Sequence, residues 1–113
     1  QDGPNSGVAI SRISVDGFNL TTIGTYLVMF QVSVSEAGQL MVTLNGTELP
    51  FTVVGRATGT SLIVGTALVQ TTTSNSVLSI RNPAGNPTAL TITPLAGGTR
   101  PSSAHLVIMR LTP

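Results

Sequence analysis

The chain has 113 residues, a formal net charge of +1 and no cysteine, which supports a single domain and excludes a disulfide framework or a thiolate metal site. Only 8% of the residues are charged, against about 25% in an ordinary soluble domain. The five cations are scattered arginines, so the clustered basic patch of a nucleic-acid-binding protein is absent, and no uninterrupted apolar run is long enough to cross a membrane. We therefore expect neither nucleic-acid binding nor membrane insertion.

The predicted elements begin after a small, polar stretch at residues 1–7, which we interpret as a linker or leader before a domain at residues 8–113. Asn45-Gly46 lies between two apolar runs and is the strongest short signal of a β-hairpin in the chain. The segments between strands are rich in Gly, Pro, Asn, Ser and Thr, as turns and loops are. Taken in chain order, strands are expected at residues 8–15, within 16–24, at 23–35, on both sides of Asn45-Gly46 within 39–54, and at 61–70, 77–81, 88–95 and 104–111.

The periodicity of the apolar residues decides the fold class. No apolar period of 3.6 residues persists for three turns, whereas Thr and Val, which favour strands, are abundant. About eight to ten short strands separated by frequent turns predict an all-β protein, with two antiparallel sheets packed as a sandwich or jelly roll.

Several of the predicted strands are apolar on both faces. Tyr26, Val28 and Phe30 share one parity in the long strand. Leu27 and Met29 share the opposite parity, and the last strand is two-sided in the same way. A two-layer sandwich covers only one face of each sheet, so overhanging loops or another subunit must cover the second face. Burial of a Leu or Met is worth about 1.5–3 kcal/mol, which favours another subunit, because so many exposed apolar side chains would form a sticky patch.

The stretch "FNLTTIGTYLVMFQVSV" resembles the signature of the tumour necrosis factor and complement globular-head superfamily, in which an apolar residue precedes a Gly-x-Tyr-x-apolar-x-aromatic run. The matching residues are Phe18, Gly24, Tyr26, Val28 and Phe30. The segments "LMVTLNGTELP", "SLIVGTALVQTTTSNSVLSI" and "SSAHLVIMRL" are similar to later strands of the same superfamily. More narrowly, "SGVAISRISVDGFNLTTIGTYLV" resembles the start of the C-terminal head domain of bacterial collagen-like surface glycoproteins, which form filaments of the spore exosporium.

This resemblance implies a jelly roll of about ten strands that forms a tight homotrimer, with the outward face of one sheet packed around a three-fold axis. Carried across by position, the trimer interface would comprise Leu27, Met29, Gln31, Ile63, Val107, Met109 and Leu111. The core of each subunit would comprise Phe18, Tyr26, Val28, Phe30, Leu106 and Ile108. Gln31 would either form hydrogen bonds within the interface or end a solvated strand, and the Tyr26 hydroxyl is expected to bond a loop carbonyl.

The chemistry of a catalytic or metal site is not visible in the sequence. His105 is the only histidine, and we interpret it as structural because it adjoins an apolar strand. Glu36 and Glu48 do not by themselves form a glycosidase signature, and no spacing joins a serine, a histidine and an aspartate into a triad. Four scattered acids also argue against a calcium site. We therefore expect no catalytic residue, no metal, no cofactor and no enzymatic activity.

The resemblance implies an extracellular, structural function. Three chains held together by the head would be aligned for a collagen triple helix, and the head would form the tip of a surface filament. The expected partners are two further copies of the chain, with host surface proteins or glycans as additional ones. An alternative is the trimeric receptor- or glycan-binding head of a phage or viral fibre. The loops at 55–60, 82–87 and 96–103 contain no aromatic residue, which disfavours this alternative and leaves Arg56 and Arg100 as its candidate contacts to anionic ligands.

Overall fold

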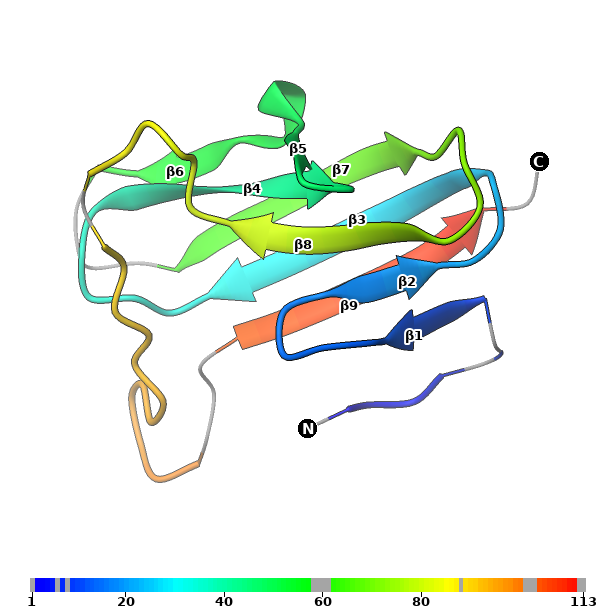
Figure 1. Ribbon diagram of the computed structural model, residues 1–113. Coiled ribbons are helices and arrows are strands. Elements are labelled where there is room, and N and C mark those ends of the chain that lie inside the picture. Colours follow the sequence, from blue (N-terminus) through cyan, green and yellow to red (C-terminus); the bar gives the residue numbers. More distant parts are fainter. Residues whose placement is uncertain are drawn as a thin grey trace.

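The computed structural model describes residues 2–5, 7, 9–57, 62–87, 89–100 and 104–111. Within this part the chain forms nine strands in two antiparallel sheets, with one short 3₁₀ turn (Figure 1). The all-β class and the two antiparallel sheets predicted from the sequence are confirmed. The elements are β1 (Ile10–Arg12), β2 (Phe18–Leu20), β3 (Thr25–Val32), β4 (Gly38–Leu44), β5 (Thr47–Glu48), η1 (Pro50–Thr52), β6 (Val54–Arg56), β7 (Ile63–Gln70), β8 (Ser76–Arg81) and β9 (Ala104–Leu111).

The two sheets differ in size and regularity. The larger sheet has six strands in the order β1-β2-β8-β4-β5, and β6 pairs with the beginning of β4. The smaller sheet has three strands in the order β7-β3-β9, and β3 pairs over its full length with both neighbours. Phe30 of β3 lies opposite Gly65 of β7 and Leu106 of β9, so the same register runs across all three strands.

The hairpin between β4 and β5 turns at Asn45 and Gly46, whose φ angles are 53° and 80°. Both residues lie in the left-handed region, which a tight type I′ turn requires and which Asn and Gly tolerate best. The Asn45 side-chain oxygen also accepts a hydrogen bond of 2.8 Å from the Val77 backbone N–H, which ties the turn to β8. The hairpin predicted from the Asn-Gly pair is therefore present.

The hydrophobic core lies between the two sheets. Three inward residues of β3, Tyr26, Val28 and Phe30, are at most 3% exposed, and they meet buried side chains of the larger sheet such as Leu20. The Tyr26 hydroxyl donates a hydrogen bond to the Thr22 carbonyl in the loop before β3. The polar end of this buried ring is thereby satisfied, which its burial requires.

The strand predicted at residues 88–95 is not observed. Residue 88 lies outside the described residues, and the rest of the segment forms one isolated bridge, between Ile92 and Val34. The backbone N–H of Thr93 donates to the Ser33 carbonyl at 2.9 Å, so the segment follows the chain just beyond the end of β3. Pro94 has no backbone N–H with which to extend the pairing.

Other boundaries also differ from the prediction. The first strand is limited to Ile10–Arg12, and β6 occupies part of the segment that was expected to be a loop from residue 55. The 3₁₀ turn was not predicted from the apolar run that contains it. Proline stands at its first position, where a missing N–H costs nothing, and the Thr52 hydroxyl accepts from the Val42 N–H at 2.8 Å.

Candidate functional site

The outward face of the smaller sheet is the candidate functional site, because it is apolar. Side chains alternate along β3, so Leu27 and Met29 point away from the core, where Val28 lies. The pairing register shows which residues of the neighbouring strands share this side of the sheet. Leu68 of β7 and Met109 of β9 lie opposite Leu27. We call this set the outer apolar face; its members are Leu27, Met29, Val64, Leu68, Val107, Met109 and Leu111.

Nothing in the described part of the chain covers the outer apolar face. Met29, Leu68 and Met109 are 40%, 54% and 51% exposed. Val64 and Val107 are 56% and 46% exposed. These side chains adjoin one another over three paired strands. A contiguous exposed patch of this kind, unlike apolar residues scattered singly, is typical of interaction surfaces.

The outward face of the smaller sheet is also nearly without ionisable groups. None of its positions carries Arg, Lys, Asp or Glu, and His105 is the one ionisable residue among them. A partner of this face would therefore be recognised by shape and apolar contact and not by charge. The positions are Thr25, Leu27, Met29 and Gln31 on β3, Val64, Thr66, Leu68 and Gln70 on β7, and His105, Val107, Met109 and Leu111 on β9.

The structure corrects one residue of the predicted interface. Six of the seven predicted residues lie on the outward face, but Ile63 is 1% exposed and belongs to the core cluster. Ile63 shares its parity with Gly65, which faces the ring of Phe30 on the core side of β7. The outward residues of β7 that the sequence analysis missed are Val64 and Leu68. Their parity was visible in the sequence, but choosing the correct face required the register against β3.

The residues predicted for the core all lie on the inward side of their strands, with different exposures. The three from β3 are buried, as described above. Phe18, Leu106 and Ile108 are half-buried, and they line a cleft at the edge of the sandwich between β1 and β9. Leu106 and Ile108 also pack against the buried core cluster.

A polar pair lies in the last row of the outward face. Gln31 and His105 are register partners, and Gln31 Nε2 lies 2.9 Å from His105 Nδ1. In this arrangement the amide donates and the ring nitrogen accepts, so the neutral ring carries its proton on Nε2. On the other neighbouring strand, β7, Val64 lies opposite Gln31. Gln31 is therefore hydrogen-bonded within the subunit at one end of an apolar surface.

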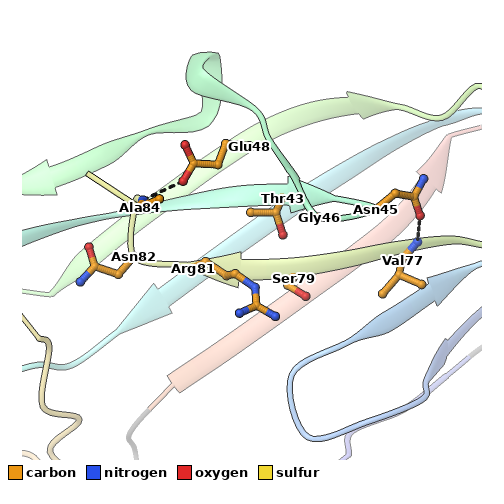
Figure 2. Close-up of a pocket in the computed structure, with 9 residues that line it drawn as sticks. All are labelled: Thr43, Asn45, Gly46, Glu48, Val77, Ser79, Arg81, Asn82 and Ala84. Atoms are coloured by element: carbon orange, nitrogen blue, oxygen red, sulfur yellow. Dashed lines mark hydrogen bonds between the residues drawn. The ribbon is translucent and has the colours of Figure 1, made fainter. Parts of the chain in front are cut away.

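A second candidate is a shallow polar hollow on the outward face of the larger sheet (Figure 2). Thr43 and Ser79 lie opposite each other on β4 and β8 and are only 4% and 5% exposed. Glu48 and Arg81 are exposed and stand around them, as Figure 2 shows. The hollow is accordingly lined by hydroxyl, carboxylate, amide and guanidinium groups.

The polar groups around this hollow hold the fold together. Glu48 Oε2 accepts a hydrogen bond of 2.7 Å from the Ala84 N–H, which ties β5 to the segment after β8 (Figure 2). Arg81 forms an ion pair with Asp16 at 3.0 Å. Together with the bond that Asn45 accepts from β8, these contacts give Glu48, Arg81 and Asn45 structural roles.

Arg56 and Glu36 are likewise engaged inside the fold. The Arg56 guanidinium donates hydrogen bonds to the carbonyls of Val34 and Glu36, so it is a structural residue, whereas Arg100 is exposed in the loop before β9. The Glu36 carboxylate accepts from the Thr91 N–H and hydroxyl, each at 2.7 Å. These hydrogen bonds hold the pKa of Glu36 below its ordinary value, and the bond from the backbone N–H has the larger effect.

The described residues contain no group of three or more His, Cys, Asp or Glu side chains placed to hold a metal ion. In the same part of the chain, no helix has the length and apolar character needed to cross a membrane. A scan against protein-family models finds no family that matches the chain, and a search of the curated proteins finds no relative. The outer apolar face is the extended exposed apolar surface of the smaller sheet.

Proposed function

We propose that the protein is a non-enzymatic, homotrimeric head whose subunits meet through the outer apolar face. The observation that carries this proposal is the face itself, in which large apolar side chains on three paired strands remain 40–56% exposed at five positions. Covering a large apolar side chain is worth up to about 1.5–3 kcal/mol. Several such side chains in each subunit supply enough free energy to offset the loss of rotational and translational freedom on assembly.

Further copies of the same chain are the favoured occupants of this face. It carries no Arg, Lys, Asp or Glu with which to select a charged partner, and an identical face offers the same apolar surface in return. Closed rotational symmetry allows every copy of the face to be covered at once. The number three comes from the resemblance to the tumour necrosis factor and complement globular-head superfamily, whose subunits pack around a three-fold axis.

The jelly-roll connectivity and the place of the domain are part of the same proposal. The two-sheet sandwich is compatible with a jelly roll, and the resemblance to collagen-like spore-surface glycoproteins favours a head at the C-terminal end of an extracellular filament. A stable trimeric head raises the effective concentration of the three chains attached to it. It would thereby align them for a collagen triple helix, in which three chains must wind in register.

The test is the molar mass in solution, measured by light scattering on a sizing column. The wild type is expected at three times 11.6 kDa. Met29→Arg places a charge in the middle of the face and is expected to give single chains or non-specific aggregates. Thr47→Arg adds the same charge at an exposed position of β5 in the larger sheet and is expected to leave the trimer intact.

A wild type that is a monodisperse monomer at all concentrations would overturn the proposal. A Met29→Arg variant that remains trimeric would also overturn it. Circular dichroism of Met29→Arg shows whether the sandwich is retained, so that loss of assembly is distinguished from loss of folding. The alternative function, a ligand-binding head of a phage or viral fibre, gains no support from the polar hollow, because Asn45, Glu48 and Arg81 at its rim are engaged in the fold.

A further inference from the structure

The outward face of the smaller sheet holds one ionisable side chain, the imidazole of His105. We infer that pH controls assembly through this face, with neutral His105 favouring assembly and protonated His105 opposing it. The inference rests on the proposed function, because it requires other copies of the chain to cover the face. The geometry behind it is the contact of 2.9 Å between His105 Nδ1 and Gln31 Nε2.

No described carboxylate is available to compensate a charged His105. On its own face His105 adjoins Gln31 and Val107, and neither is ionisable. Three charged residues line the cleft along the β9 edge together with His105. They are Asp2, Arg12 and Arg110. Asp2 is paired with Arg12 at 2.8 Å, and Arg110 has the opposite parity on β9.

The cost of covering a charged imidazole follows from these surroundings. The neutral ring accepts the hydrogen bond from Gln31, so its Nδ1 is satisfied when water is excluded. A protonated ring presents a donor to the amide nitrogen of Gln31. Rotation of the amide by half a turn restores a hydrogen bond but supplies no negative charge, so the imidazolium would be desolvated without a counter-ion.

The direction of the pH effect follows from proton linkage. Covering the face disfavours the proton on His105, so the free chain binds more protons than the assembled chain. Assembly therefore strengthens as the pH rises and weakens as it falls through the range of about 5 to 8, in which imidazoles change charge. The largest possible effect on the association constant is about tenfold per chain for each pH unit.

The first experiment measures the guanidinium chloride concentration at which light scattering reports dissociation of the trimer, at about pH 8 and about pH 5.5. We expect a lower midpoint at the lower pH for the wild type. His105→Gln keeps a polar partner for Gln31 but cannot titrate in this range, so its two midpoints are expected to coincide. Equal wild-type midpoints would overturn the inference and leave the trimer standing, whereas single chains at every pH would overturn both proposals.

A second experiment follows the proton directly. The chain has one histidine, so the Cε1–H resonance of His105 is identified without a mutant. Leu68→Arg provides the unassembled reference, because its new charge lies on β7, with β3 between it and β9. We expect the resonance to titrate at lower pH in the assembled wild type than in Leu68→Arg, and coincident titrations would overturn the inference even if His105→Gln failed to fold.

Discussion

Gly65 of β7 lies directly opposite Phe30 of β3, and a Cβ atom on Gly65 would lie 2.3 Å from the Phe30 ring. The ring therefore covers the glycine on the core side of the smaller sheet. A glycine in the interior of a strand is otherwise unfavourable, so its presence here is explained by the space that the ring needs. The same contact determines which side of β7 is inward.

Gly65→Ala is expected to destabilise the domain. The added methyl group overlaps ring atoms in a packed core, which typically costs about 1–3 kcal/mol of unfolding free energy. Gly85→Ala is the matched control, because a Cβ there meets no atom within 4 Å. Unfolding in urea at one fixed chain concentration gives the comparison, since the proposed assembly would add a concentration-dependent contribution. Equal stability of the two variants would contradict the packing of Phe30 over Gly65.

Ile63 and Leu68 are expected to separate folding from the proposed assembly, because they lie on opposite faces of β7. Ile63→Ala removes a side chain that is 1% exposed and should lower the unfolding free energy by about 2–5 kcal/mol. Leu68→Arg changes a side chain that is 54% exposed and should leave the circular dichroism spectrum intact while preventing assembly. A Leu68→Arg variant that assembled normally would show that this strand is not part of the interface.

These two residues also show what the sequence could and could not predict. Alternation within one strand is a local property, so the two faces of β3 and β9 were separable from the sequence. Which face of β7 is inward depends on pairing with a strand about forty residues away, and Gly65 contributes no side chain from which to infer it. Ile63 was assigned by carrying positions across from the resemblance, and without the register nothing in the sequence corrected that assignment to Val64 and Leu68.

The strand predicted at residues 88–95 was wrong for a different physical reason. Its alternating Thr, Leu and Ile residues have the composition of a strand, but strand formation also requires a neighbouring edge to pair with. β3 ends at Val32, and Pro94 removes a donor, so only the bridge at Ile92 forms. The polar pair of Gln31 and His105 was equally invisible, because it joins residues 74 positions apart.

Tyr26→Phe is expected to destabilise the domain by about 0.5–1.5 kcal/mol, the net value of one hydrogen bond. The ring is fully buried, and its hydroxyl donates to the Thr22 carbonyl in the preceding loop, so the substitution removes the donor and keeps the packing. Thr22→Ala serves as the control, since the acceptor is a backbone oxygen that this substitution retains. If Tyr26→Phe matched the wild type in urea unfolding, the hydrogen bond would contribute nothing to stability.

The lowered pKa of Glu36 makes the stability of the domain depend on pH in the acidic range. Its pKa is lowered in the folded chain, chiefly by the backbone N–H of Thr91 and then by the Thr91 hydroxyl. The unfolded chain therefore binds a proton at Glu36 before the folded chain does. The resulting stabilisation is complete above the ordinary value of 4.5 and is lost as the pH falls through the lowered folded value.

Glu36→Gln isolates this contribution, because glutamine has the same shape and does not titrate. We expect the unfolding free energy of the wild type to fall more steeply than that of Glu36→Gln between about pH 5 and about pH 3. Asp2, whose pKa is also lowered by its hydrogen bond to Arg12, is present in both proteins and cancels in the difference. Urea unfolding across this range provides the measurement. If the unfolding free energies of the wild type and Glu36→Gln changed in parallel with pH, the charge of Glu36 would not strengthen its hydrogen bonds with Thr91.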